Sequence, residues 1–94
     1  MSREGAKVVE ERLLTIPLRK AYYGTRWRRV EKAVRLLKEH VARHVKAREV
    51  KISTEVNEAL WARGAEKPPR RLAVRVAKGE DGVAWVYLQR DRPG

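Results

Sequence analysis

Apolar residues in the middle of the chain recur every three or four positions, as they do on one side of a helix. The stripe comprises Trp27, Val30, Val34, Leu37, Val41 and Val45. Arg28, Lys32, Arg35, Arg43 and Lys46 project to the opposite side. The pattern predicts an amphipathic helix from Arg26 to about Lys46, with Thr25 as its N-cap, Trp27 in the core and one basic side.

Four other segments have the composition or the alternation of β-strands. They are residues 9–16, Glu49–Ile52, Arg70–Ala77 and Val83–Leu88. Pro17 would end the first of them, because proline cannot donate a ladder hydrogen bond. In the third, the even-numbered apolar residues would face the core, and Arg71 and Arg75 the other side. Val83–Leu88 has no polar face, so we expect it to be central in the sheet or covered on both sides.

A second, shorter helix is expected over about residues 54–63. Its N-cap would be Ser53 or Thr54. Val56 and Leu60 are one turn apart and should face the core, with Trp61 beside them. The element order is then β-α-β-α-β-β. This order predicts an α+β fold of two layers, in which the helices pack on one face of a small mixed sheet.

Length and composition fit one domain over residues 1–94, with its core at about 9–88 and short tails. Of the 94 residues, 43% are hydrophobic, which suffices for one modest core. There is no cysteine, so disulfides and thiolate sites are excluded. The longest apolar run is Val83–Leu88, and the first residues lack the apolar segment of a signal peptide. We therefore expect a soluble intracellular protein without membrane insertion.

Charge is the most informative property of the composition. The chain has 23 Lys and Arg against 12 Asp and Glu, a formal net charge of +11. Such an excess destabilises the folded state by self-repulsion unless a polyanion neutralises it. Arginine outnumbers lysine, which favours bidentate phosphate contacts and stacking on bases. The composition therefore favours a structured nucleic acid as partner, RNA rather than DNA.

Two stretches concentrate the basic residues that we predict to bind RNA. The first cluster runs through a connector into the long helix and comprises Arg19, Lys20, Arg26, Arg28 and Arg29, continued on the basic side by Lys32 and Arg35. A helix N-terminus would add free N–H groups there. The second cluster follows two stiffening prolines and comprises Lys67, Arg70, Arg71 and Arg75. Tyr22 and Tyr23 lie within the first cluster, and the sequence leaves open whether they pack in the core or contact the partner.

Nothing in the sequence predicts catalysis, a metal site or a cofactor. His40 and His44 have a spacing that can bind a metal, but no HExxH motif and no third ligand accompany them, so we expect histidines bordering the apolar stripe. There is no Gly-rich phosphate loop of a nucleotide-binding type. The turn Gly79–Gly82 is acidic, unlike the phosphate clamp of a KH domain, and the strands lack the aromatic pattern of an RRM. We expect no enzyme.

Several blocks of the sequence resemble a known family. Arg12–Ala21, Glu49–Ser53, Val56–Gly64 and Lys67–Arg71 are similar to the thirty-first large-subunit ribosomal protein shared by archaea and eukaryotes, over about residues 9–88. Without the long C-terminal extension of eukaryotic members, the chain resembles an archaeal one. The resemblance implies a cytoplasmic, ribosomal protein that binds large-subunit rRNA near the polypeptide exit tunnel. Its partners would be that rRNA, neighbouring ribosomal proteins and nascent-chain factors at the tunnel rim.

Two other interpretations stay open. A basic chromatin or regulatory protein that binds DNA would need a helix free to enter a major groove, and a dimer. An adaptor for other proteins would bind its partner without dependence on salt.

Overall fold

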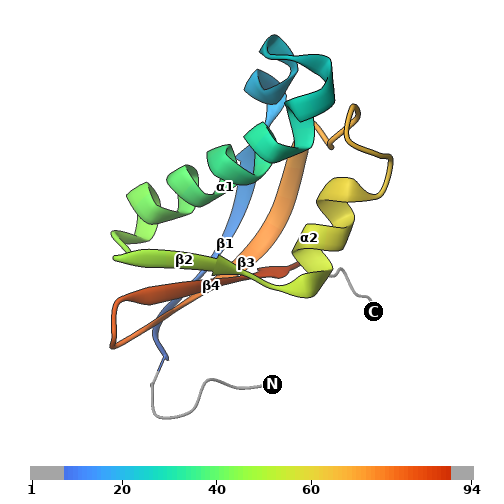
Figure 1. The fold of residues 1–94 in the computed structure, drawn as a ribbon. Coiled ribbons are helices and arrows are strands. Elements are labelled where there is room, and N and C mark those ends of the chain that lie inside the picture. The colour runs from blue at the N-terminus through green and yellow to red at the C-terminus, as the bar shows by residue number, and fades with distance from the viewer. Residues whose placement is uncertain (1–7, 90–94) are drawn as a thin grey trace.

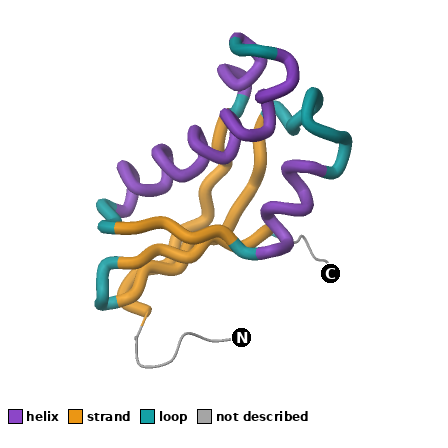
Figure 2. Tube along the Cα trace, in the orientation of Figure 1, coloured by secondary structure: helices purple, strands orange, loops and turns teal. Residues whose placement is uncertain are grey.

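A four-stranded mixed sheet forms one layer of the structure and two helices form the other (Figures 1 and 2). The computed structural model describes residues 8–89. The strands are β1 (Val8–Pro17), β2 (Glu49–Ile52), β3 (Arg71–Gly79) and β4 (Val83–Leu88), in the spatial order β1-β3-β4-β2. β3 is antiparallel to both β1 and β4, whereas β2 runs parallel to β4. The predicted α+β class, with its two layers and mixed sheet, is confirmed.

Both helices, α1 (Arg29–Val45) and α2 (Thr54–Trp61), cover the same face of the sheet (Figure 1). The buried stripe of α1 consists of Val30, Ala33, Leu37, Val41 and Val45. On the sheet, the buried partners include Ile16, Val74, Val76, Ala84 and Val86. The core is therefore the single layer between the helices and this face, and it consists of aliphatic side chains.

The second helix begins at the predicted cap. The backbone N–H of Val56 donates to the Ser53 hydroxyl over 3.3 Å, and Val56 and Leu60 are fully buried. Trp61 is 39% exposed, so it lies at the border of the core rather than inside it. The helix ends at Trp61, two residues earlier than predicted.

The first helix begins three residues later than its apolar pattern predicted. Two 3-10 segments precede it, η1 (Arg19–Tyr23) and η2 (Arg26–Arg28), where the sequence suggested a plain connector and the first helical turn. The side chain of Thr25 makes no capping hydrogen bond. The placement of Trp27 in the core was wrong, because its side chain is 66% exposed. This segment stands beyond the ends of β1 and β3, so no strand lies beneath it (Figure 1).

The central strand β4 has the predicted bounds, but the helices cover only one of its faces. On the other face the rings of Trp85 and Tyr87 stack with their centroids 6.4 Å apart. Gln89 extends the ladder by donating its N–H to Ala73 O over 3.2 Å. The rest of the predicted tail, like residues 1–7, lies outside the described residues. Within 8–89, neither helix has the length and apolar content needed to span a bilayer.

Candidate nucleic-acid interface

The two basic clusters of the sequence come together at one end of the molecule. We call this region the basic end and define it as residues 18–30 and 62–71. It contains η1, η2, the start of α1 and the loop before β3, which stand side by side at the top of Figure 1. β1 ends there at Pro17 and β3 begins there at Arg71, since these two residues are partners in the antiparallel ladder.

Backbone hydrogen bonds fix the 62–70 loop against the first cluster. Leu18 N donates to Arg70 O over 2.7 Å, and Val30 N donates to Ala65 O over 3.2 Å. Val30 is in the first turn of α1, where backbone N–H groups have no partner within the helix. The loop therefore satisfies one of these N–H groups and joins two segments that are about forty residues apart in the sequence.

Tyr22 connects the two clusters through its side chain. Its hydroxyl donates to Pro68 O over 2.5 Å, and the guanidinium carbons of Arg29 and Arg70 each lie 4.7 Å from the centre of its ring. Cation–π contacts of this kind stabilise by about 0.5–2 kcal/mol. The sequence left open whether Tyr22 packs in the core or contacts the partner. The structure shows that Tyr22 is a half-buried structural residue, which positions one arginine from each cluster.

Arg29 also has a structural part in this arrangement. One terminal nitrogen of Arg29 donates to Glu66 O over 3.2 Å, and the Arg29 Nε is buried and has no hydrogen-bond partner among residues 8–89. Arg26 faces the same residue, with 3.7 Å between its Nε and the Glu66 carboxylate. Glu66 is the only acidic residue in the basic end, so these contacts leave most of its positive charge uncompensated.

The other predicted residues of the basic end, and Arg70 despite its contact with the Tyr22 ring, are exposed to solvent. Within residues 8–89 no carboxylate forms an ion pair with any of these six side chains: Arg19, Lys20, Arg28, Lys67, Arg70 and Arg71. All six are exposed. Unpaired, exposed cations that are held close together by a rigid loop can neutralise phosphates without first breaking internal ion pairs.

Lys32 and Arg35 lie on α1, beyond its first turn. A Cβ atom added to Gly24 would be 3.5 Å from both Cδ and Nζ of Lys32, so this lysine folds back over the connector between η1 and η2. Arg35 is exposed on the outer side of the helix. Lys32 thus extends the basic end, and Arg35 continues it along α1.

Arg75 is the one predicted residue that the fold separates from the others. It lies on the helix-free face of the sheet, where it pairs with Glu11 at 2.9 Å and its guanidinium lies 4.7 Å from the centre of the Tyr87 ring. The alternation of β3 places Arg71 and Arg75 on one face, but a rise of about 3.3 Å per residue moves them roughly 13 Å apart. Arg75 therefore belongs to a different surface from the basic end.

His40 lies half-buried on α1, as expected for a histidine that borders the apolar stripe, and His44 is exposed one turn further along the helix. Their rings stack 4.2 Å apart, and burial, followed by the nearby charges of His44 and Arg43, lowers the pKa of His40 below its ordinary value. Among the described residues no group of three or more His, Cys, Asp or Glu side chains is arranged to hold a metal ion.

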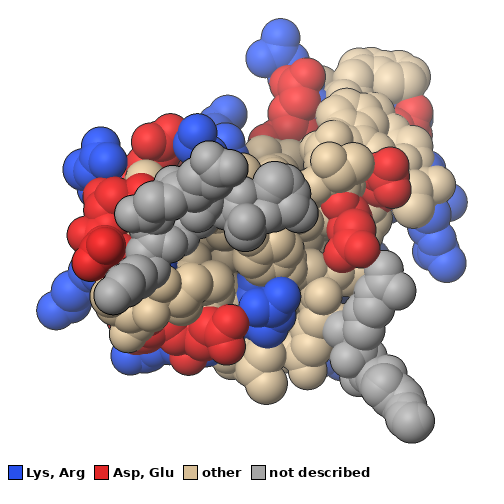
Figure 3. Space-filling view, turned by 90° about the horizontal axis from the view of Figure 1, so that it is seen from below, with Lys and Arg blue, Asp and Glu red and all other residues tan. Residues whose placement is uncertain are grey.

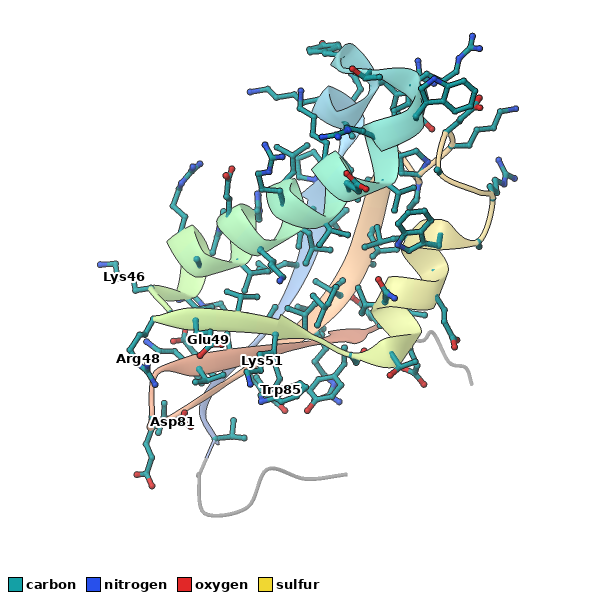
Figure 4. All side chains as sticks on the ribbon, in the orientation of Figure 1. Lys46, Arg48, Glu49, Lys51, Asp81 and Trp85 are labelled. Carbon is teal, nitrogen blue, oxygen red and sulfur yellow. The ribbon has the colours of Figure 1, made fainter. Side chains whose placement is uncertain are left out.

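The opposite end of the molecule is also rich in cations. We call it the far end and define it as residues 45–51 and 78–85; Figure 4 labels several of its side chains. Arg48 donates twice to Asp81 O, at 3.3 and 3.2 Å, and Lys78 donates to Val45 O over 2.8 Å. Glu49, Glu80 and Asp81 are interspersed with these cations. Figure 3, seen from below, shows acidic and basic side chains intermixed on this part of the surface.

Comparison with known proteins identifies the family to which these features belong. A family model described as ribosomal protein L31e matches residues 8–82, which include every residue predicted to bind RNA. The chain is similar to the large ribosomal subunit protein eL31 of Methanopyrus kandleri, with 45% identity over 83 residues, 88% of this chain and 96% of the relative. It is also similar to the protein of that name from Pyrobaculum neutrophilum, with 48% identity over 88 residues, 92% and 97% of the two chains. The resemblance to archaeal members is confirmed, and the chain belongs to the ribosomal protein L31e family.

Proposed function

We propose that this protein binds large-subunit rRNA through its basic end, close to the polypeptide exit tunnel. As a member of the L31e family it is a structural component of the large ribosomal subunit in the cytoplasm and not an enzyme. Family membership also favours this function over the DNA-binding alternative. Neighbouring ribosomal proteins are further partners, and the far end, turned away from the rRNA, is available to nascent-chain factors at the tunnel rim.

One observation carries the rRNA-binding proposal. The two arginine- and lysine-rich segments, 18–30 and 62–71, meet at one end of the fold, and Glu66 is the one acidic residue within them. Folding a chain so that like charges converge is unfavourable in isolation. The arrangement becomes favourable once phosphates neutralise it, and a surface of this kind recognises the shape and backbone of a folded RNA rather than a base sequence.

The test compares two double variants that remove the same charge from opposite ends. Lys67→Ala/Arg71→Ala changes the basic end, and Lys46→Ala/Lys51→Ala is the matched control at the far end. For the first we expect weaker binding to rRNA fragments and a salt dependence that is shallower by about 1.5 in slope, because about two phosphate contacts are lost. The control should keep both the affinity and the slope.

Cosedimentation with large subunits checks the same proposal in the assembled particle. The native chain should remain with the subunits at moderate salt, and the Lys67→Ala/Arg71→Ala variant should be released at lower salt than the far-end control. A native protein that stays wholly in the soluble fraction contradicts the proposal. Thermal unfolding of all three proteins verifies that the variants are folded.

A further inference from the structure

A surface hollow lies beside the basic end, between η1 and the outer side of α1. Its volume is about 400 Å³, within the range of sites for small ligands. α1 contributes Leu36, Glu39, His40 and Arg43, which follow one another at helical spacing. The connector and η1 contribute Pro17, Arg19, Lys20 and Tyr23. The hollow is too small for a duplex but has room for a single nucleotide.

One wall of the hollow is apolar and aromatic. Tyr23 is 74% exposed, and Leu36 and Pro17 supply aliphatic surface beside it. Unlike its neighbour Tyr22, whose ring is covered by two arginines, Tyr23 has no ring contact or hydrogen bond within residues 8–89. An exposed ring of this kind offers a flat face for a nucleobase, whose stacking contributes about 1–3 kcal/mol.

The hollow is also lined by three cationic side chains, those of Arg19, Lys20 and Arg43. Each is exposed, and none forms an ion pair with a carboxylate among the described residues. Arg43 follows Arg19 and Lys20 by more than twenty residues in the sequence, and the fold brings these three residues to one hollow. His40 adds a polar group without adding charge near neutral pH, because burial and the adjacent charges of His44 and Arg43 lower its pKa.

We propose that this hollow binds one unpaired nucleotide of RNA, with its base against Tyr23, Leu36 and Pro17 and its phosphates at Arg19, Lys20 and Arg43. The inference rests on the proposed rRNA-binding function and adds a specific contact to it. Glu39 is the one acidic group of the hollow. A carboxylate accepts hydrogen bonds, and the Watson–Crick edge of guanine presents two adjacent N–H donors, so guanine is the preferred base. An acidic peptide fits less well, because its carboxylates would approach Glu39.

The experiment measures binding to short RNA hairpins by fluorescence anisotropy. One hairpin carries a single bulged guanosine, and its partner is fully paired but otherwise identical. We expect the native protein to prefer the bulged RNA by about 5- to 150-fold, the value of one stacked base. Tyr23→Ala should abolish that preference and Tyr23→Phe should retain it, while Arg43→Ala should weaken binding to the bulged RNA and lower its salt slope.

Two matched controls keep the test specific to the hollow. Trp27→Ala removes another exposed aromatic side chain, and Arg35→Ala removes another exposed arginine of α1; neither residue lines the hollow. Both variants should keep the preference for the bulge. If Trp27→Ala loses it to the same extent as Tyr23→Ala, or if the native protein does not distinguish the two hairpins, the inference is wrong. Thermal unfolding of each variant separates loss of binding from loss of the fold.

Base identity and competition provide the last arms of the experiment. Replacing the bulged guanosine with adenosine, cytidine or uridine should weaken binding to the native protein, and Glu39→Gln should reduce these differences.

A glutamate-rich peptide that binds more tightly than the bulged RNA, and does so through Tyr23, overturns the inference in favour of a protein partner. Equal binding to both hairpins with intact, salt-dependent rRNA binding contradicts only the hollow. Absence of binding to any RNA contradicts the proposed function itself.

Discussion

The two ends of this molecule carry similar residues and differ in what surrounds them. At the basic end the cations are exposed and form no ion pair within residues 8–89, and Glu66 is the single acidic residue of those segments; these cations are Arg19, Lys20, Arg28, Lys67, Arg70 and Arg71. At the far end, Arg48 and Lys78 donate to backbone carbonyls, and Glu49, Glu80 and Asp81 are interspersed with the cations. The same side-chain chemistry therefore stabilises a turn at one end and remains available to a partner at the other.

The difference shows that local compensation, rather than the number of cations, locates a candidate polyanion site. An arginine whose guanidinium already donates to a carbonyl must lose that bond before it contacts a phosphate, at a cost of about 0.5–1.5 kcal/mol. An arginine without such a bond has no equivalent cost. The net charge of +11 predicted a polyanion as partner, and the placement of the acidic groups and carbonyls is the basis for proposing that this partner binds at the basic end.

Charge reversal is the most severe test of this comparison. Arg19→Glu/Lys20→Glu and Lys46→Glu/Lys51→Glu each change the net charge by −4, from +11 to +7. We expect the first to weaken rRNA binding at least about 100-fold, because contacts are lost and repulsion is added. The second should weaken it by less than about 5-fold, through the long-range field alone. Equal losses in filter binding at a fixed salt concentration would show that total charge matters and location does not.

A smaller effect is expected from the hydrogen bonds that hold each end together. Tyr22→Phe removes the hydroxyl that donates to Pro68 O, and Arg48→Ala removes the two bonds to Asp81 O. Each change should lower the free energy of unfolding by about 1 kcal/mol, measured by denaturant titration. Only Tyr22→Phe should also weaken rRNA binding, because the 62–70 loop then positions its cations less firmly. A loss of affinity in Arg48→Ala would contradict the division between the two ends.

One residue of the far end, Lys46, has a strained backbone conformation and is not expected to contact rRNA. Lys46 follows α1 with φ 55° and ψ 47°, a left-handed conformation that disfavours residues with a Cβ atom. Lys46→Gly should raise the free energy of unfolding by about 0.5–1 kcal/mol. Lys46→Ala keeps the strain and removes the charge, so it serves as the control and should not be stabilised. Neither variant should change rRNA affinity by more than about 2-fold in the same filter-binding assay.

The smallest expected effect is a dependence of the free energy of unfolding on pH, caused by His40 beside the basic end. Burial first, then His44 and Arg43, lowers the pKa of His40 below 6.5, and Arg19 and Lys20 face the same hollow. The unfolded chain therefore takes up a proton at a higher pH than the folded one. Stability should fall as the pH is lowered through 6.5 toward the folded-state pKa.

Urea titrations between about pH 7.5 and about pH 5 measure this dependence. His40→Gln should reduce it, because the side chain no longer titrates. His44→Gln should reduce it less, since it removes a cause that ranks below burial and also removes the stacked ring. A decrease in stability that is the same in the native protein and in His40→Gln assigns the effect to other groups.

The strands were predictable because local patterns define them. Glu49–Ile52 and Val83–Leu88 have the bounds that their composition indicated, and the alternation in β3 correctly separated the core face from Arg71 and Arg75. The Ser53 cap was equally local, because a hydroxyl three residues before a backbone N–H can satisfy it. The start of α1 was not predictable in this way, since the helical period continues to Trp27 while the sheet beneath it does not.

The candidate site was also predictable only where it depends on residues that are close together in the sequence. Their clustering along the chain was visible in the sequence, but the separation of Arg75 from the second cluster depends on which residues β1 and β4 place beside it, namely Glu11 and Tyr87. The sequence left the role of Tyr23 open, and it placed Arg43 on the basic side of the long helix without including it among the residues predicted to bind RNA. The helical spacing of Leu36, Glu39, His40 and Arg43 was a signal for one wall of the hollow, but the position of η1 opposite that wall could not be read from it.

By itself the sequence determined the α+β class, the order of the elements and most of the buried stripe of the long helix, namely Val30, Leu37, Val41 and Val45, and it predicted a polyanionic partner. These depend on side-chain periodicity and on net charge, which are properties of the chain before it folds. Only the tertiary structure decided that segments 18–30 and 62–71 meet at one end, because Tyr22, Leu18 and Val30 bind a loop about forty residues away. Contacts at such distances depend on how the whole sheet and both helices pack, and no local pattern encodes them.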